Sequence, residues 1–347
     1  MRATSRMRLS VEITLRPRES GYVLLLTLVF IVIISLSIGY FAQKVDLARE
    51  LTAKAQARAD ASFNIHNQLN QMLYRLAVVR PSFSGIGQGN TAIQVDNRPY
   101  QVGDLTVRLM DQRGLMSLRF IDTPRMARLL GAFGVPLDQQ TALIEALQDY
   151  IDPDNDRRLN GAEAPQYAAA GLPPPANEPL RDVNQLRRVY GWAAQKQLWQ
   201  DNQFTQLLTV ASVSGINPNA APAAILATLP NIDQALAQSL IHYRQTKPID
   251  YQVMSQITGL SAMQMQFLVF PFPSSYLRIE IACACSHPVM QYNVVLTPAS
   301  AEAPWHFSRI AMQDASWPPN NPTPPKSIEQ LPKIVNSPPV TSNIFSP

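Results

Sequence analysis

The sequence predicts an α+β fold with a long N-terminal transmembrane helix, a small antiparallel β-sheet and a large inserted all-α domain. An uncharged apolar run follows an Arg-rich leader, strand-like alternation appears in two places far apart, and helical signals fill the residues between them. With 347 residues, 46% of them hydrophobic, the chain is long enough for two compact units and too apolar to be disordered throughout.

The apolar run is residues 21–42, GYVLLLTLVFIVIISLSIGYFA. It is long enough to cross a bilayer core of about 30 Å. Arginines precede it, so the positive-inside rule places the N-terminus in the cytoplasm and the C-terminal bulk beyond a bacterial inner membrane. A secretory signal peptide is the alternative interpretation. Against it, the run exceeds the usual h-region of about 7–15 residues, and no clear A-x-A site follows.

The same helix is expected to continue to about residue 80, because Gly and Pro are absent from residue 43 until Pro81. Its second half is amphipathic, with apolar residues recurring at three- and four-residue spacings. These residues are Leu47, Leu51, Ala55, Ala59, Phe63, Leu69, Met72, Leu73 and Leu76. We therefore predict a single helix over 22–80, with its transmembrane part at 22–42, after a leader at 1–21.

The sheet is expected in residues 91–122 and 274–312. RPYQVGDLTVRLM and GLMSLRFI, joined by the turn at 111–114, predict a β-hairpin. The later strands are predicted at 276–285, 291–296 and 306–312. Between the two parts, Thr123 as a helix cap followed by Pro124 opens a helical domain over 123–273.

The C-terminal segment and the charge balance exclude some alternatives. Residues 313–347 are Pro-rich and are expected to be disordered or extended. Five of the 29 basic residues precede residue 21, and the rest of the chain is nearly neutral, which argues against nucleic-acid binding. Cys283 and Cys285 are too close in sequence to bridge readily without strain, and they are too few for a zinc site unless His287 and another ligand join them. We therefore expect free thiols, with a bridge or a metal site as the alternatives.

An acidic loop follows the helix DQQTALIEALQDYI, which Pro153 ends. Oxygen-bearing side chains stand at positions 1, 3, 5, 9 and 12 of a twelve-residue loop, the ligand spacing of an EF-hand. They are Asp152, Asp154, Asp156, Asn160 and Glu163, and Arg158 at position 7 would offer its backbone carbonyl. This spacing indicates a Ca²⁺ site.

Two residues argue against a true EF-hand. Arg157 stands where Gly normally permits the sharp turn, and Pro165 stands where the exiting helix should begin. We therefore expect a Ca²⁺ loop on a different scaffold. A solvated acidic turn is the alternative. A catalytic carboxylate pair is disfavoured, because nothing nearby supplies a nucleophile or would separate the two pKa values.

A pair of helices later in the chain resembles a helix-hairpin-helix. Residues 181–192 and 249–260 predict short helices ending in Gly191 and Gly259, and two further helices between them are joined by LPNID at 229–233. Phosphate-binding hairpins place glycines where this chain has Asn231 and Asp233, and Asp233 would repel phosphate. A packing module is expected. The alternative is a membrane-tethered DNA-binding protein of the competence type.

The order of leader, apolar helix and hairpin, together with three motifs, resembles the K-type minor pseudopilin family of type II secretion systems. The motifs are D-Y-I-D-x-D…G-A-E, N-E-P-L-R-D-V-x-Q-L-R-x-V-x-G and I-N-P-N-A-A-P-A-A-I-L. The resemblance covers roughly residues 16–312, and its most specific part is 143–191.

The resemblance implies a non-enzymatic structural protein with a pilin-like fold, which caps and initiates a pseudopilus for export across the outer membrane. It implies I-type and J-type minor pseudopilins and the inner-membrane secretion platform as partners, in the inner membrane of a Gram-negative bacterium. It also implies a prepilin peptidase that cuts between Gly21 and Tyr22, with Tyr22 then N-methylated, and Ca²⁺ bound in the inserted domain.

For the metal site, the resemblance extends the expected ligands to Asp149, Asp152, Asp154, Asp156 and Glu163, with the loop around Asn177 as a further source. It also gives meaning to Leu26. Most pilins have Glu at this fifth position after the cut, where it neutralises a neighbour's terminal amine in the apolar core. Its absence suits a subunit at the filament tip, although Leu26 is equally suited to face lipid.

Overall fold

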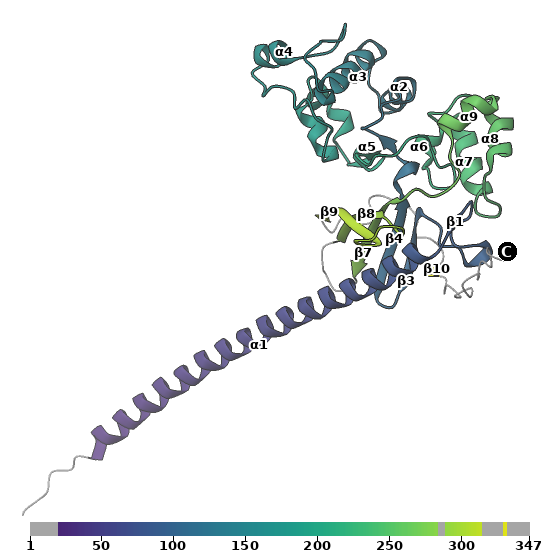
Figure 1. The fold of residues 1–347 in the computed structure, drawn as a ribbon. Helices are drawn as coiled ribbons and strands as arrows, with labels where there is room; N and C mark the ends of the chain where they lie inside the picture. The colour runs from purple at the N-terminus through teal and green to yellow at the C-terminus, as the bar shows by residue number, and fades with distance from the viewer. Residues whose placement is uncertain (1–19, 284–288, 314–328, 332–347) are drawn as a thin grey trace, which may run out of the picture. The chain divides into compact units, whose positions relative to one another are not determined.

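The computed structural model describes residues 20–283, 289–313 and 329–331 (Figure 1). The chain divides into two compact units, residues 1–60 and 61–347. The α-helices and strands in chain order are α1 Ser20–Val78, β1 Pro81–Ser82, β2 Gly85–Ile86, β3 Asp96–Val102, β4 Leu105–Asp111, β5 Met116–Ser117, α2 Thr123–Ala132, α3 Leu137–Ile151, α4 Ala164–Ala169, α5 Gln203–Gln206, β6 Leu208–Thr209, α6 Ala223–Leu226, α7 Gln234–Tyr243, α8 Tyr251–Thr258, α9 Ala262–Leu268, β7 Tyr276–Cys283, β8 Val289–Leu296, β9 Trp305–Gln313 and β10 Glu329–Gln330.

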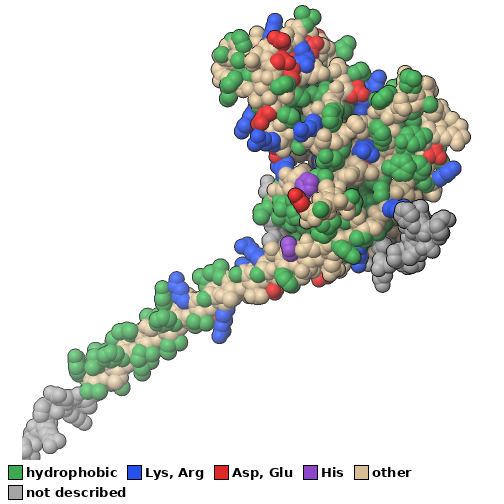
Figure 2. All heavy atoms as spheres, viewed as in Figure 1, with side chains coloured by type: hydrophobic (Ala, Val, Ile, Leu, Met, Phe, Trp, Pro, Cys, Tyr) green, Lys and Arg blue, Asp and Glu red, His purple; other side chains and the backbone are tan. Residues whose placement is uncertain are grey.

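Helix α1 is a single helix of 59 residues, which continues past the apolar run as the absence of Gly and Pro from residues 43–80 predicts. Residues 22–60 are exposed throughout, and Figure 2 shows apolar side chains along the first part of this stretch. From residue 61 onward one face of the helix is buried and the other is exposed. Ile65, Leu69, Leu73 and Leu76 are buried against the sheet, so hydrophobic burial holds only this last part of α1 in the second unit.

The main sheet has six strands in the order β10-β3-β4-β7-β8-β9. Its neighbours pair antiparallel, except that β10 runs parallel to β3. The face toward α1 carries buried aliphatic residues such as Val107, Leu109, Ile279 and Val294. The long N-terminal helix and the mainly antiparallel sheet are both predicted from the sequence, and the structure adds that the end of the helix packs on the sheet.

The first hairpin differs from our prediction. The turn lies at Gly103-Asp104, where Val102 pairs with Leu105 and Gly103 has φ +59°. The expected turn at 111–114 is instead a 3-10 helix, and the strand after it, β5, pairs in parallel with β6. The left-handed conformation at Gly103 favours a tight two-residue turn. The segment RPYQVGDLTVRLM, which we predicted as the first strand of the hairpin, therefore contains both strands and the turn.

The helical segments lie between β4 and β7, which are themselves neighbours in the sheet, with Asp111 paired to Leu277. The helical segment therefore begins after β4 and ends before β7, so that both of its ends join adjacent strands of the sheet. It has its own core, in which Trp192, Tyr167 and Phe204 are fully buried. Helix α2 begins one residue earlier than predicted, because the Asp122 side chain caps it by accepting from Arg125 N–H at 3.1 Å.

Buried polar contacts join the helical segment to the sheet. The carboxylate of Asp111 accepts hydrogen bonds from Ser274 Oγ at 2.5 Å, Ser274 N, Asn217 Nδ2 and Arg113 N. On β7, Arg278 donates to the carbonyls of Gln206 and Leu208. Burial raises the pKa of Asp111, and these hydrogen bonds oppose the shift.

Three further predictions, for residues 181–192, the two cysteines and the C-terminal segment, can be compared with the structure. Residues 183–188 form a 3-10 helix rather than an α-helix, while Gly191 and Gly259 adopt the left-handed conformation expected of them. Cys283 is disulfide-bonded, so free thiols are the wrong expectation there; disulfides persist in oxidising compartments such as the periplasm. Cys285 lies outside the described residues. So does most of the C-terminal segment, but its residues 329–330 pair with β3.

Candidate functional site

The acidic loop connects α3 to α4 in the helical segment. Helix α3 ends at Ile151, as Pro153 predicts, and α4 begins at Ala164 directly after Glu163. Our objection that Pro165 prevents an exiting helix is therefore wrong, because proline is tolerated in the first turn, where its missing N–H has no helical partner to lose. The result is a helix, a twelve-residue loop and a short helix.

At the base of the loop, Asp149 is fully buried and faces the loop backbone. Its carboxylate accepts from Arg158 Nη1 at 2.6 Å and, more weakly, from Arg158 N–H. The same Nη1 contacts Asp152 Oδ2 at 2.5 Å, so one guanidinium bridges two carboxylates. Gly161 makes room for this arrangement, because a Cβ atom there would stand 2.0 Å from Asp149 Oδ2.

Glu163 ends the loop with a carboxylate that is almost completely buried. The carboxylate faces the N–H groups at the start of α4, but neither of its oxygens reaches hydrogen-bond geometry with a described residue, and the same holds for Asp152 Oδ1 and Asn177 Oδ1. Burial, and then the charges of Asp149, Asp152 and Asp154, raise the pKa of Glu163. This region therefore contains four buried oxygen atoms without a hydrogen-bond donor, whereas buried polar atoms in folded proteins are normally hydrogen-bonded.

The remaining predicted ligands lie further out. Asp154 is exposed and accepts from the N–H of Asp156 at 2.9 Å, and the charge of Asp154 reaches Glu163. Asp156 is also exposed. Asn177 donates its side-chain amide to Asp154 O at 2.8 Å, which fixes the loop expected to supply further oxygens.

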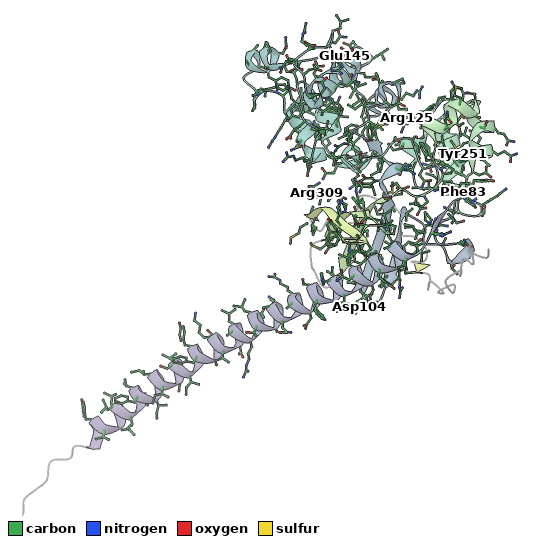
Figure 3. All side chains as sticks on the ribbon, in the orientation of Figure 1. Phe83, Asp104, Arg125, Glu145, Tyr251 and Arg309 are labelled. Atoms are coloured by element: carbon green, nitrogen blue, oxygen red, sulfur yellow. The ribbon has the colours of Figure 1, made fainter. Side chains whose placement is uncertain are left out.

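Sequence reasoning missed two side chains at this site. It considered only the backbone carbonyl of Arg158, whereas the guanidinium bridges Asp149 and Asp152. It also missed Glu145, labelled in Figure 3, whose carboxylate accepts from Asn160 N–H at 2.6 Å. Glu145 is one helical turn before Asp149 on α3, and that i, i+4 spacing is the signal that could have found it.

The arrangement gathers oxygens and negative charge around one cation, the Arg158 guanidinium. Within the described ranges of the chain, no three Asp, Glu, His or Cys side chains stand in a ready metal-holding arrangement. Chemically, Arg158 neutralises Asp149 and Asp152, whereas the buried carboxylate of Glu163 has no ion-pair partner among the described residues.

The residues that the sequence predicts for membrane insertion and processing lie on α1. Tyr22 is 71% exposed and Leu26 43% exposed, on a helix whose most apolar stretch has a mean hydropathy of 2.7 and no buried residues. Gly21 belongs to the same helix. Of the described residues, α1 alone contains a segment long and apolar enough to span a membrane.

The helical hairpin joined at residues 229–233 packs against the core of the helical segment and does not present backbone N–H groups to an anion. Leu229 and Ile232 of the connecting loop are buried in the core of the helical segment. Asp233 caps α7 by accepting from Leu236 N–H at 2.8 Å, and Asn231 donates to Thr258 O. A carboxylate at the helix start opposes phosphate, so the DNA-binding alternative is not supported.

Comparison with known proteins gives one consistent result. Residues 119–201 match the family model described as Type II secretion system (T2SS), protein K. Type II secretion system protein K of Pectobacterium carotovorum subsp. carotovorum is 26% identical over 196 residues, which are 51% of this chain and 60% of that protein. The match therefore spans less than two thirds of that relative.

A similar chain occurs among the solved structures, in the crystal structure of the GspK-GspI-GspJ complex from the type 2 secretion system of enterotoxigenic Escherichia coli. Its TM-score is 0.48 and its sequence identity 17%, over 77% of this chain and 99% of that one.

Proposed function

We propose that this chain belongs to the type II secretion system protein K family and is a minor pseudopilin that caps and initiates the pseudopilus for protein export across the outer membrane. One observation carries the proposal. In chain order, the matched residues 119–201 come between β4 and β7, neighbouring strands of a sheet that packs on the last part of α1, and the first part of α1 is exposed and apolar.

The localisation follows from α1. A single apolar helix with arginines before it favours a single-pass inner-membrane protein with a cytoplasmic N-terminus and a periplasmic C-terminal unit. In this position the protein acts through assembly rather than catalysis. Periplasmic accessibility of an engineered thiol at Asp201, on the exposed surface, tests the orientation.

The proposed processing removes residues 1–21. Prepilin peptidase would cut between Gly21 and Tyr22 on the cytoplasmic side, and Tyr22 would be N-methylated. Leu26 then leaves the fifth position uncharged, which suits the tip, where no preceding subunit presents an amine to be neutralised. Intact mass of the membrane-extracted protein distinguishes this cleavage from a signal peptide or an uncleaved anchor.

We also propose that the acidic loop binds Ca²⁺. The donor set fits, because the buried oxygens of Glu163, Asp152 and Asn177 have no donors among the described residues and Ca²⁺ prefers oxygen ligands. Asp149, Asp152, Asp154, Asp156 and Glu163 are the proposed carboxylate ligands. The ion would take over the neutralising role of Arg158 and stabilise the helical segment.

The proposed partners are the I-type and J-type minor pseudopilins, with the inner-membrane secretion platform and the prepilin peptidase as transient contacts. The exposed apolar half of α1 would pack on partner helices in the membrane. Deleting the gene in its host and restoring it tests the function. Loss of export that the wild-type chain rescues supports the proposal, and unchanged export in the deletion strain contradicts it.

A further inference from the structure

A cavity of about 400 Å³ lies beside the Gly-rich loop that follows α1. One wall comes from this loop, including Phe83 and Gly85, and another from the end of α7 and the turn after it, including Arg244 and Lys247. The volume falls within the range of about 300–1,000 Å³ that is usual for small-molecule sites.

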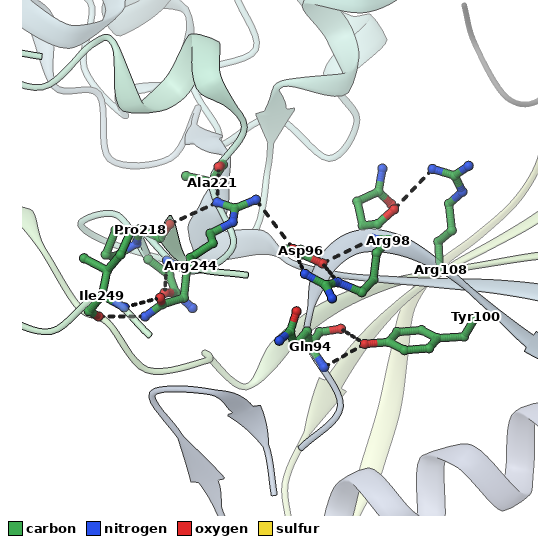
Figure 4. Close-up of polar contacts among 12 residues, drawn as sticks. Gln94, Asp96, Arg98, Tyr100, Arg108, Pro218, Ala221, Arg244 and Ile249 are labelled. Atoms are coloured by element: carbon green, nitrogen blue, oxygen red, sulfur yellow. Dashed lines mark hydrogen bonds and ion pairs between the residues drawn. The ribbon is translucent and has the colours of Figure 1, made fainter. Parts of the chain in front are cut away.

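Arg244 is the central group of this cavity wall. Its side chain is 6% exposed, and its Nη1 donates to the carbonyls of Pro218 at 3.0 Å and Ala221 at 2.6 Å (Figure 4). Its Nε is buried and has no hydrogen-bond partner among the described residues. A buried guanidinium N–H without an acceptor costs free energy, so Arg244 stands in this cavity wall with part of its hydrogen-bonding capacity unused.

The nearest carboxylate is committed to another arginine. Asp96 accepts from both Nε and Nη2 of Arg98 at 2.9 Å, whereas its distance to Arg244 Nη2 is 3.7 Å, too long for a hydrogen bond (Figure 4). Asp96 therefore neutralises Arg98 first. Burial lowers the pKa of Arg244, and Asp96 only partly opposes this, as expected of a buried cation with a distant counter-ion.

The rest of the wall is preformed. A Cβ atom at Gly85, which has φ +128°, would stand 2.2 Å from Ile93 O, so the Gly-rich loop is fixed close to the following backbone. Asn219 fixes the opposite side, because its side chain bonds both N–H and C=O of Ile249. Phe83 stacks on Phe272 with ring centroids 4.2 Å apart and meets Tyr251 edge-on, which provides an apolar rim. Phe83 and Tyr251 are labelled in Figure 3.

The charges favour a particular kind of anion. Lys247 is exposed on the cavity wall and can approach a bound ligand, and Arg98 also lines the cavity but is paired with Asp96, so Arg244 and Lys247 are the two cations left for a ligand. Asp96 stands 3.7 Å from Arg244 Nη2, and its negative charge opposes a dianion such as phosphate. A monoanionic group with two acceptor oxygens fits better, since one oxygen can face the Arg244 guanidinium and the other can face Lys247.

We propose that this cavity binds a small carboxylate ligand through Arg244 and Lys247, with its apolar part against Phe83. The carboxylate can come from a free organic acid or from an acidic side chain of another polypeptide. This site is separate from the acidic loop and does not depend on the proposed role in secretion.

Calorimetric titration of the full-length chain in detergent tests the proposal, with succinate, N-acetylglutamate amide and inorganic phosphate as probes. We expect saturable binding of a carboxylate probe. Arg244→Lys, which keeps the charge and removes Nε, should weaken it about tenfold or more. Lys247→Gln should weaken it by up to about fivefold, and Lys196→Gln, which removes an exposed charge elsewhere, should leave it unchanged.

Preference for succinate would identify a free acid as the source, and preference for the amide would identify a peptide side chain. Lys247 is exposed, so its variant keeps the test valid even if Arg244→Lys unfolds. No saturable binding, binding of phosphate alone, or equal weakening by Lys247→Gln and Lys196→Gln would overturn the proposal.

Discussion

The carboxylate of Asp149 lies against the bare backbone of Gly161, where an added Cβ atom would stand 2.0 Å from Oδ2. This contact joins the last turn of α3 to the end of the acidic loop. Because Asp149 is fully buried, it has no room to move away. The position of the loop therefore depends on the absence of a side chain at residue 161.

Gly161→Ala should lower the free energy of unfolding by about 1–3 kcal/mol, because it forces overpacking against a buried carboxylate. It should also weaken Ca²⁺ binding. Thermal unfolding and calorimetry of the full-length chain measure both effects. Gly39→Ala is the control, since nothing lies within 4 Å of its added Cβ. Equal stability of the two variants would contradict the contact.

Arg158→Gln should make the metal-free loop less stable and Ca²⁺ binding at least about fivefold tighter, since Ca²⁺ no longer has to displace the guanidinium from Asp149 and Asp152. Arg157→Gln, at the exposed neighbouring residue, is the matched control. Calorimetric titration with Ca²⁺ measures the difference. Weaker binding by Arg158→Gln than by Arg157→Gln would show that the guanidinium supports the site instead of competing for it.

Glu163 should make metal-free stability depend on pH. Burial and the neighbouring carboxylates raise the pKa of Glu163 in the folded state above its value in the unfolded chain. The contribution of Glu163 to the free energy of unfolding is therefore fully present below the unfolded pKa and is lost as pH rises through the folded pKa. In chelator, the melting temperature should therefore fall from acidic toward neutral pH, and Ca²⁺ should restore it. Glu163→Gln should flatten both responses, whereas exposed Glu302→Gln should retain them. Identical curves for the two variants would refute this role.

Asp111→Asn should destabilise the second unit by about 1–3 kcal/mol, because an amide replaces a carboxylate oxygen that accepts from buried donors on Ser274 and Asn217. Asp104→Asn, in the exposed hairpin turn, should change stability little. Denaturant unfolding of both variants measures the difference. If Asp104→Asn lowered the free energy of unfolding as much as Asp111→Asn, the stabilising role assigned to the Asp111 hydrogen bonds would be contradicted.

Local signals predicted much of this fold. The absence of Gly and Pro from residues 43–80 predicted the second half of α1, Pro153 predicted the end of α3, and a glycine in the left-handed conformation ends α8 at Gly259. The first hairpin was misplaced because Gly103 and Gly114 are both plausible turn residues. Only the pairing of β5 with β6, which lies far along the chain, decides between them.

The candidate site was predictable to a similar extent. The spacing of the acidic residues located the loop, but spacing alone does not reveal which carboxylates are buried. Asp149 and Glu163 are buried, whereas Asp154 and Asp156 are exposed. The bridging position of the Arg158 guanidinium depends on the folded loop, and so does the contact of Asp149 with Gly161.

Co-purification tests the central claim most directly. The full-length chain, tagged at its C-terminus, is extracted in detergent from membranes that also contain I-type and J-type pseudopilins, with a variant truncated before α2 as the control. We predict that the intact chain retains both partners in one stoichiometric complex. Recovery of the folded, membrane-inserted chain without either partner would contradict its role as a minor pseudopilin.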